Sequence, residues 1–330
     1  MTAVAALREV KEWGAQLPDL RAQDISDIGI GPDDSVYLLY RAPSYIVACA
    51  PDGTPLRTIG EGILGPRAHG VTVTAAGLVY VVDSGAHRIV ILSPDGGVLR
   101  EFGSGPTNPE FAGTWTGEYI DHVHRAYPPF CLPTRIAVAP SGEMFVSDGY
   151  GNCRIHHFTR DGDLVASWGD PGTGPGQFHT PHDIYLDKDG RVLVCDREND
   201  RIQVFDSGGR FLKQWTDLRR PQAVVQGPDG LFYVGEGAWR PGHVSPVHGK
   251  VAPASSRVSV LAEDGTAVER LGETGERAGP AATDLFYAAH GITIDSAGAL
   301  YVAEVSLSVG KQFPEPASHV ATTKYSRAAG

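Results

Sequence analysis

Three histidines carry the strongest chemical signal in this sequence. They are His69, His182 and His290, and each begins a short run with alternating apolar residues, as in Ala289-His290-Gly291-Ile292-Thr293-Ile294. A turn signal and a second apolar run follow each one, so the three hold one position in copies of one structural unit. They stand 113 and 108 residues apart, about twice the length of such a unit. In a closed ring of six units they would point three imidazoles at one axis, which is the ligand pattern of a catalytic zinc site.

The elements that would position these histidines are short strands that recur along the whole chain. Each unit consists of a short strand, a glycine turn, an apolar strand that ends in a polar residue, and two further strands separated by another glycine turn. The six units cover Ile25–Gly60, His69–Gly103, Thr134–Gly169, His182–Trp215, Gln222–Gly272 and the segment from His290 onward. Four strands at a period near 40 residues are typical of a β-propeller. We therefore predict an all-β fold, a single six-bladed β-propeller over residues 1–330.

Two insertions and one missing strand modify this pattern. The equivalent inner-strand positions are Ser26, His69, Thr134, His182, Gln222 and His290. Their spacing locates insertions near 104–130 and 237–256, which we expect to form a lid over the channel. The sixth unit ends without room for a fourth strand, and residues 8–14 resemble the fourth strands at 163–169 and 210–215. We expect the N-terminal segment to complete the last blade and close the ring.

Charge and composition argue against several classes of partner. The chain of 330 residues has a formal charge of −11 and a pI near 5.5, which disfavours nucleic acid and anionic membranes. The chain contains no run of about 18 apolar residues, so no membrane span is predicted. Charged residues interrupt Met1–Trp13, so a signal peptide is not expected, and four cysteines fit a reducing cytoplasm. The oligomeric state is left open. The sequence context places four further histidines at strand or loop surfaces, namely His87, His156, His157 and His179.

The stretch from Phe130 to Phe205 resembles the lyase domain of peptidylglycine α-amidating enzymes, peptidyl-α-hydroxyglycine α-amidating lyase, among the NHL-repeat propellers. The matching segments are Phe130–Thr134, Val146–Ile155, Trp168-Gly169, Pro175–Phe178, Pro181-His182 and Asp196–Gln203. The resemblance extends more weakly to His69-Gly70, Tyr40-Arg41 and His290. The part Asp-x-x-Asn-x-Arg-Ile occurs in any NHL propeller and carries no function.

The resemblance implies a zinc-dependent lyase. It assigns zinc to the three histidines, with Ca²⁺ as a weaker alternative, and it completes the site with Tyr150 and Arg41. The family reaction breaks the C–N bond of a carbinolamide and releases an amide and glyoxylate. Zinc would act as a Lewis acid on the hydroxyl side of the substrate. A nearby cation favours the phenolate form of a tyrosine, so Tyr150 would be the base, and Arg41 would hold a carboxylate or carbonyl.

Two positions depart from the family pattern. The family carries a cysteine directly after the tyrosine and forms a disulfide there, whereas this chain has Gly151. For Cys131 and Cys153 we expect free thiols, with a disulfide between them as the alternative. An acidic residue linked to a structural calcium follows the last family histidine, whereas Gly291 stands here. The substrate could therefore be a small-molecule carbinolamide such as ureidoglycolate, or a peptide-terminal one.

Two other function classes remain at this stage. One is a metal-dependent hydrolase such as a lactonase, in which zinc activates water. The other is a non-enzymatic NHL binding propeller, which would not need three histidines in one register. Metal content separates the binding propeller from both enzymes, and product analysis separates lyase from hydrolase. For Asp83, Asp148 and Asp196 we expect hydrogen bonds to strand ends and no catalytic role.

Overall fold

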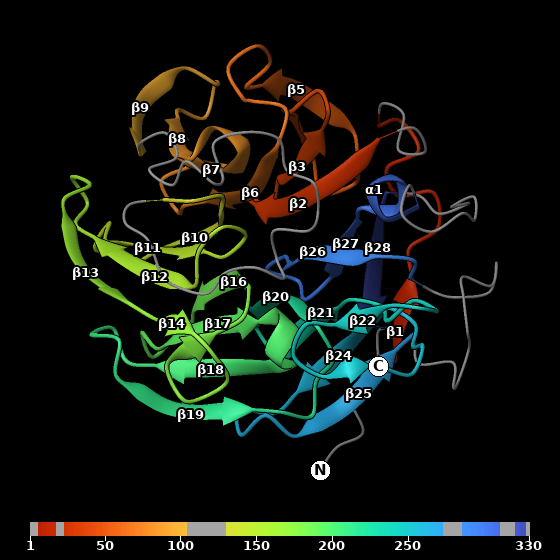
Figure 1. Ribbon diagram of the computed structural model, residues 1–330. Helices are drawn as coiled ribbons and strands as arrows, with labels where there is room; N and C mark the ends of the chain where they lie inside the picture. Colours follow the sequence, from red (N-terminus) through yellow and green to blue (C-terminus); the bar gives the residue numbers. More distant parts are fainter. Residues whose placement is uncertain (1–5, 18–22, 104–129, 273–285, 311–320, 328–330) are drawn as a thin grey trace.

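The computed structural model describes residues 6–17, 23–103, 130–272, 286–310 and 321–327. These residues form six four-stranded antiparallel sheets arranged as blades around one axis (Figure 1). The first strand of each blade lies innermost and packs against the first strands of both neighbouring blades. The predicted all-β, six-bladed propeller is confirmed.

The blades run in sequence order. Blade 1 contains β2 (Asp24–Ile30), β3 (Val36–Arg41), β4 (Tyr45–Cys49) and β5 (Pro55–Ile59). Blade 2 contains β6 (Ala68–Val73), β7 (Val79–Asp83), β8 (Arg88–Leu92) and β9 (Val98–Gly103). Blade 3 contains β10 (Pro133–Val138), β11 (Met144–Asp148), β12 (Arg154–Phe158) and β13 (Leu164–Trp168). Blade 4 contains β16 (Pro181–Leu186), β17 (Val192–Asp196), β18 (Arg201–Phe205) and β19 (Phe211–Trp215). Blade 5 contains β20 (Pro221–Gln226), β21 (Phe232–Glu236), β24 (Arg257–Leu261) and β25 (Ala267–Leu271). Blade 6 contains β26 (Ala289–Ile294), β27 (Leu300–Glu304), β28 (Thr322–Arg327) and β1 (Leu7–Glu9).

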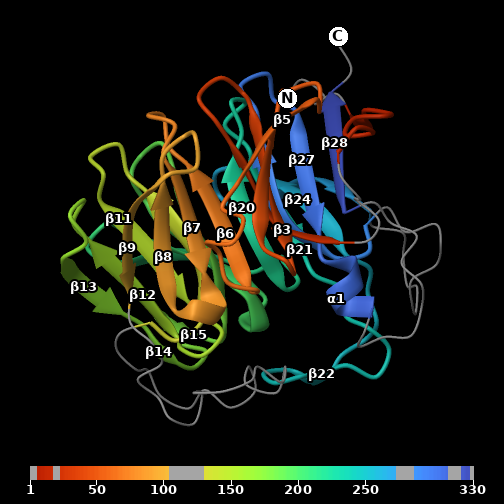
Figure 2. The same cartoon turned by 90° about the horizontal axis from the view of Figure 1, so that it is seen from above.

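Short elements lie in the loops at the end where the inner strands begin, most of them between the second and third strands of one blade. They are η1 (Ser84–Ala86), β14 (Asp170–Pro171), β15 (Gln177–Phe178), η4 (Arg197–Asn199), β22 (Val244–Ser245), β23 (Gly249–Lys250) and α1 (Ser306–Gly310). Figure 2 shows α1 and β22 at the same end of the blades. Within the described ranges, no helix is long and apolar enough to cross a membrane.

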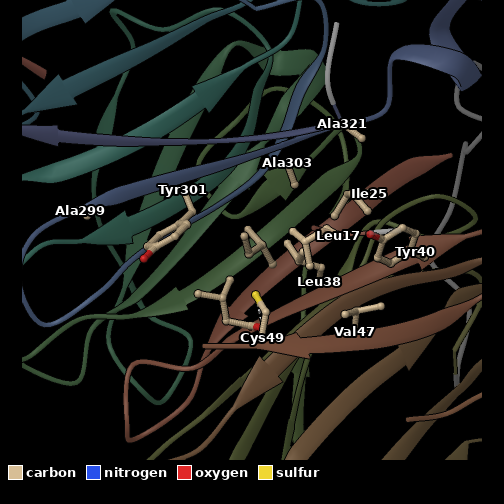
Figure 3. Close-up of a cluster of buried hydrophobic side chains, with 12 residues drawn as sticks. Leu17, Ile25, Leu38, Tyr40, Val47, Cys49, Ala299, Tyr301, Ala303 and Ala321 are labelled. Carbon is tan, nitrogen blue, oxygen red and sulfur yellow. Dashed lines mark hydrogen bonds between the residues drawn. The ribbon is translucent and has the colours of Figure 1, made fainter. Parts of the chain in front are cut away.

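The N-terminal strand closes the ring, as the sequence predicts. Strand β1 pairs antiparallel with β28, so that Leu7 lies opposite Arg327. The strand is shorter than residues 8–14, because the chain turns at Glu12, which has a φ of 64°. Trp13 then packs edge-on against Tyr301 at 5.1 Å between ring centroids. This contact belongs to the apolar cluster between blades 1 and 6 that Figure 3 shows, so strands from both ends of the chain hold the ring together.

Each inner strand is irregular at one position. The ladder between the first two strands shifts register at Ile25/Asp27, Ala68/Gly70, Pro133/Arg135, Pro181/Asp183, Pro221/Ala223 and Ala289/Gly291. The residue skipped in each case is the equivalent position identified in the sequence: Ser26, His69, Thr134, His182, Gln222 and His290. A β-bulge re-aims the side chain of the extra residue. The six bulges thus turn one residue of every blade away from its ladder.

Candidate metal centre and active site

The bulges bring three histidines together on the axis. His69, His182 and His290 are buried, with 5%, 2% and 7% of their surface exposed. One ligand nitrogen from each lies within 4.8 Å of the others, and the ring centroids are 4.7–4.9 Å apart. Because alternate blades supply them, they approach the axis from three sides. The structure therefore places the predicted metal ligands in one cluster.

The intervening blades orient each imidazole through its other nitrogen. The Nδ1 atoms of His69, His182 and His290 lie 2.8, 2.7 and 2.7 Å from the backbone carbonyls of Thr134, Gln222 and Ser26. A carbonyl only accepts, so each Nδ1 carries the proton and each neutral imidazole presents a lone pair at Nε2. This is how proteins orient metal-binding histidines. The residues that alternate with the histidines thus set their tautomer.

Tyr150 completes the cluster from blade 3. Its hydroxyl oxygen lies 2.9 Å from Nε2 of His69 and 2.8 Å from Nε2 of His182. A phenol has one proton, so it satisfies one of these two lone pairs and leaves the other without a donor. Burial, and then nearby charged and imidazole groups such as Arg197 and His290, hold the pKa of His182 well below its usual value and favour its neutral form. Converging neutral imidazole lone pairs with too few protons fit a bound cation, and imidazole nitrogen suits Zn²⁺ better than Ca²⁺.

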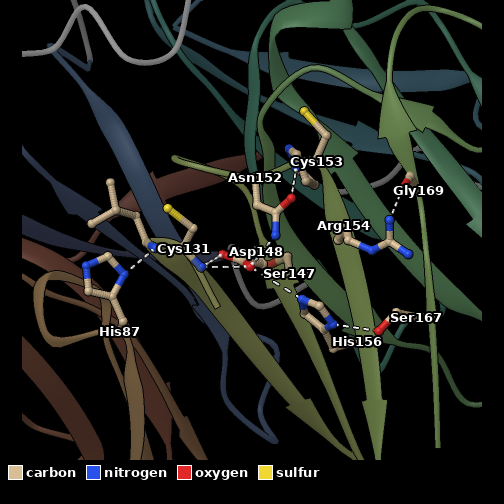
Figure 4. A network of polar contacts seen from close by, with 12 residues as sticks. His87, Cys131, Ser147, Asp148, Asn152, Cys153, Arg154, His156, Ser167 and Gly169 are labelled. Atoms are coloured by element: carbon tan, nitrogen blue, oxygen red, sulfur yellow. Dashed lines mark hydrogen bonds and ion pairs between the residues drawn. The ribbon is translucent and has the colours of Figure 1, made fainter. Parts of the chain in front are cut away.

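The turn that carries Tyr150 is held by Asp148 at the end of β11. The Asp148 carboxylate accepts hydrogen bonds from the backbone N–H of Cys131 and from the Asn152 amide at 2.9 Å, and it contacts Nε2 of His156 at 3.3 Å (Figure 4). The backbone N–H of Gly151 donates to the Cys131 carbonyl at 3.0 Å. Asp148 thus makes the expected kind of hydrogen bond, to the segment just before β10, and it also holds the turn that carries Tyr150.

The expected surface positions of three histidines are wrong. His87, His156 and His157 are buried, with 6%, 2% and 8% of their surface exposed. Nδ1 of His87 accepts the Leu132 backbone N–H at 2.9 Å, and Nδ1 of His156 lies 2.7 Å from the Ser167 hydroxyl. His156 and His157 lie on β12, which pairs with β11 on one side and β13 on the other.

Cys131 and Cys153 are free, buried thiols in the structure, in line with the first of the two alternatives. Burial raises the pKa of both thiols to about 12. The Cys131 sulfur fills the space over Gly151, where an added Cβ would collide with it. Gly151 therefore allows the turn after Tyr150 to pack closely against Cys131.

Arg41 stands where the other five blades carry an acid. At the end of the second strand those blades have Asp83, Asp148, Asp196, Glu236 and Glu304, and each carboxylate accepts a backbone N–H from the segment that leads into its own blade. Arg41 cannot accept such a bond. Among the described residues, no carboxylate lies within ion-pair distance of its guanidinium. After burial, which is the main cause, the Arg41 charge lowers the pKa of His290, so Arg41 acts electrostatically on the histidine cluster.

Arg197 is a site residue that the sequence argument missed. It follows Asp196 in η4, has 5% of its surface exposed, and its guanidinium lies 5.5 Å from the centroid of the Tyr150 ring. Its Nε donates to Glu198 at 2.7 Å, and Nη2 is buried without a hydrogen-bond partner in the described residues. Although burial alone would raise the pKa of Glu198, Arg220 and Arg197 lower it to about 2. The only available signal was an arginine at a variable position of the repeat motif.

An ion triad closes the channel below the histidines. Arg135 pairs with Asp27 and lies 3.4 Å from Asp183, with Nε facing the carboxylate. A cavity of about 10 Å³ remains between this triad and the histidines, and a wider hollow of about 190 Å³ lies on the far side. Gly70 makes room for Arg135, since a Cβ there would lie 3.1 Å from Cδ of Arg135 as well as 2.8 Å from the Thr134 carbonyl oxygen. The triad therefore blocks this side of the cluster, whereas Tyr150 and Arg197 lie on the other side.

The described insertion at 237–256 lies at that same end. Arg240 donates to the backbone carbonyl of Tyr287, just before β26, and the Arg220 guanidinium lies 4.7 Å from the Trp239 ring centroid. His243 packs edge-on against Trp239 at 4.9 Å. The other expected lid segment, 104–130, lies almost wholly outside the described residues. The position of the second insertion agrees with its expected place beside the site.

Comparison with known proteins matches the part of the chain that carries His69, Tyr150 and His182. The NHL repeat matches residues 66–92, 130–158 and 178–205. Peptidyl-glycine alpha-amidating monooxygenase A of Xenopus laevis is 40% identical over 130 residues, which cover 36% of this chain and 14% of that protein. The probable peptidyl-alpha-hydroxyglycine alpha-amidating lyase of Caenorhabditis elegans is 34% identical over 143 residues, covering 42% of this chain and 37% of that protein. The matched segments thus span well under half of these relatives.

The fold as a whole is shared more widely. A streptogramin B lyase structure superposes with a TM-score of 0.56 at 15% identity and covers 98% of each chain, a likeness that concerns the fold alone. The repeats, the ring of blades and the matched relatives agree with one another. The chain is a six-bladed propeller with NHL repeats, and it resembles the peptidyl-α-hydroxyglycine α-amidating lyases.

Proposed function

We propose that this protein is a zinc-dependent carbon–nitrogen lyase that cleaves a carbinolamide bearing a carboxylate. The observation that carries the proposal is the Tyr150 hydroxyl, which lies between the Nε2 atoms of two of three convergent histidines. A proton-transfer group is thus held against a metal-binding cluster. The similarity to amidating lyases over about 40% of the chain supports the same reaction class.

His69, His182 and His290 would hold the metal. When bound, zinc supplies Lewis acidity that makes a nearby hydroxyl group more acidic. The protein's own contribution is to keep the three imidazoles neutral and oriented, through the carbonyls of Thr134, Gln222 and Ser26.

Tyr150 and the arginines carry the rest of the mechanism. Tyr150, as phenolate, accepts the proton of the substrate hydroxyl. The electron pair left on that oxygen forms the new carbonyl, and the bond between this carbon and the amide nitrogen breaks. The nitrogen takes up a proton, so that the products are a primary amide and an aldehyde acid such as glyoxylate. Arg41, whose charge acts on His290, and Nη2 of Arg197, which is buried without a partner among the described residues, would hold the substrate carboxylate.

The test uses zinc-loaded protein with N-acetyl-α-hydroxyglycine and with ureidoglycolate. We expect glyoxylate and the corresponding amide or urea in equal amounts, from at least one of the two compounds. Tyr150→Phe should abolish most of this turnover, whereas Tyr80→Phe on β7 should not. The absence of glyoxylate from both compounds at full zinc loading would refute the lyase. Hydrolysis of a lactone by the same preparation would then favour the hydrolase.

A further inference from the structure

The Arg197 guanidinium is held by a carboxylate that the proposed mechanism does not use. Glu198 follows Arg197 in η4, and only 1% of its surface is exposed. Its Oε1 accepts hydrogen bonds from Nε of Arg197 at 2.7 Å and from Nη2 of Arg220 at 2.9 Å. Arg197 in turn lies 5.5 Å from the centroid of the Tyr150 ring. Its guanidinium is therefore anchored at Nε by Glu198, while its buried Nη2 has no partner among the described residues and remains available for a ligand.

The turn that carries these two residues is fixed independently of their ion pair. The backbone N–H of Arg197 donates to the Thr180 carbonyl at 3.1 Å, and that of Glu198 donates to the His179 carbonyl at 3.0 Å. Both acceptors lie just before β16. The backbone bonds thus fix where the long Arg197 side chain begins, and the Glu198 carboxylate fixes where its guanidinium ends.

Arg220 connects the same carboxylate to the insertion at 237–256. Its guanidinium lies 4.7 Å from the centroid of the Trp239 ring, and its Nη1 donates to the Ala238 carbonyl at 3.2 Å. The Arg220 backbone carbonyl accepts the N–H of Gly237 at 2.9 Å. Trp239 is buried, with 4% of its surface exposed, so this stacking is a packed contact. The first residues of the insertion are thus attached to the carboxylate through one arginine.

We infer that Glu198 is a positioning residue for the substrate carboxylate, and that it makes the insertion at 237–256 part of this binding site. The inference rests on the proposed lyase function for the identity of the ligand. Glu198 holds the Arg197 guanidinium beside Tyr150, and Trp239 holds Arg220 against Glu198. The insertion then affects substrate affinity through this chain of contacts.

Removing Glu198 distinguishes positioning from a simple effect of charge. Glu198→Ala takes a negative charge away from the site, so charge alone would make an anion bind more tightly. A positioning role predicts the opposite, because the guanidinium of Arg197 loses its anchor. For the carbinolamide that the protein cleaves, we expect KM to rise by about 10- to 100-fold, the scale of a charged hydrogen bond, with a smaller change in kcat. An unchanged or lowered KM would overturn the inference.

A double-mutant cycle tests the connection to the insertion. Trp239→Ala should raise KM by about 3-fold, the scale of a cation–π contact. Added to Glu198→Ala, the same change should have no further effect, because the chain of contacts is already broken. Val244→Ala, at an exposed position of the same insertion, is the matched control and should leave KM unchanged. Effects of Glu198→Ala and Trp239→Ala that simply multiply would refute the role of the insertion.

Calorimetric binding of glycolate to zinc-loaded protein separates this inference from the proposed function. Glycolate has the hydroxyl and the carboxylate of the substrate but no bond to cleave. If no carbinolamide is turned over, the lyase proposal fails, and the Kd for glycolate across the same cycle still tests the inference. Weaker binding in Glu198→Ala, with no further loss on adding Trp239→Ala, supports it. Absence of glycolate binding by the unmodified protein, or an equal Kd in Glu198→Ala, rejects it.

A second variant covers the case in which Glu198→Ala does not fold, as judged by circular dichroism. Glu198→Gln keeps the volume of the side chain and removes only its charge. It should weaken glycolate binding by a smaller factor, because the hydrogen bonds from the two arginines lose their charged acceptor. Tighter binding in Glu198→Gln would show that only charge is at work and would reject the positioning role. Zinc content measured on each sample confirms that the metal is retained.

Discussion

The hydroxyl oxygen of Tyr150 lies 2.9 Å from Nε2 of His69. Nδ1 of the same imidazole faces the Thr134 carbonyl at 2.8 Å, so Nε2 carries a lone pair that competes with Nε2 of His182 for the one proton of the Tyr150 hydroxyl. A metal bound at Nε2 removes this acceptor. The hydroxyl would then need another acceptor, which couples metal loading to the hydrogen bonding of the proposed base.

The first prediction concerns metal content. We expect about one zinc ion per chain in purified protein, measured by elemental analysis. His69→Ala, His182→Ala and His290→Ala should each lose most of it, because two imidazoles remain where three are needed. The blades are held by their own apolar clusters, so the far-UV spectrum should be retained. Full zinc content in all three variants would eliminate the site.

The second prediction separates metal binding from proton transfer. Tyr150→Phe removes only the hydroxyl group and should leave zinc content unchanged. Turnover should fall by about 100-fold or more, the usual scale of a general base. A variant with reduced zinc and proportionally reduced turnover would instead indicate that Tyr150 helps to hold the metal. Metal analysis and kcat on the same sample distinguish the two outcomes.

The third prediction tests the carbonyl that orients His69. A Cβ on Gly70 would lie 2.8 Å from the Thr134 oxygen and 3.1 Å from Cδ of Arg135. Gly70→Ala should displace that oxygen and weaken zinc affinity by about 10- to 100-fold. Gly208→Ala, whose nearest atom beyond its chain neighbours is Asp206 Oδ1 at 3.4 Å, is the control. A competition assay with a zinc chelator gives the affinity, and equal affinities for the two variants would contradict the role assigned to the carbonyl.

The fourth prediction concerns Arg41. Arg41→Lys keeps the positive charge but loses the planar fork that binds a carboxylate through two parallel hydrogen bonds. We expect KM to rise by about 10-fold with a smaller change in kcat, because the lost contact is present in both ground and transition states. Arg57→Lys on outer strand β5 of the same blade should leave both constants unchanged. An effect confined to kcat would place Arg41 in the proton transfer.

The fifth prediction is a pH dependence of stability. Burial raises the pKa of Glu304 to about 7, even though its carboxylate accepts the backbone N–H groups of Tyr287 and Ala288. The unfolded-state pKa is near about 4.3, so between these values the folded state binds more protons, and stability falls as the pH rises from about 4.3 to 7. Glu304→Gln should remove this loss, on the order of 1–3 kcal/mol.

The measurement for Glu304 is the unfolding free energy of both proteins between pH 5 and pH 8. The difference in favour of Glu304→Gln should grow with pH over this range. Glu61→Gln at an exposed turn is the control and should show a constant difference. A difference for Glu304→Gln that shrinks as the pH rises would reverse the assigned sign.

The sequence by itself determined the architecture and the three histidines that are candidate metal ligands. Alternating apolar residues and glycine turns are local signals, and their repetition was enough to predict six blades, the closing N-terminal strand and three histidines in one register. Tyr150 and Arg41 came from the resemblance to a known family. The buried positions of His156 and His157 were missed, because the alternation within a strand does not show that a neighbouring blade covers its outer face.

The tertiary structure alone decided how the site is assembled. The bulge at each inner strand, and the carbonyls that set the histidine tautomers, depend on contacts between blades that lie 40 to 264 residues apart. Arg197 lies on a loop of blade 4, and no sequence spacing reports that its guanidinium lies over the Tyr150 ring of blade 3. Arg135 is likewise an ordinary strand residue until the ring brings it between Asp27 and Asp183. Local patterns specify the blades, whereas closure of the ring determines which loops meet and therefore which charges surround the metal ligands.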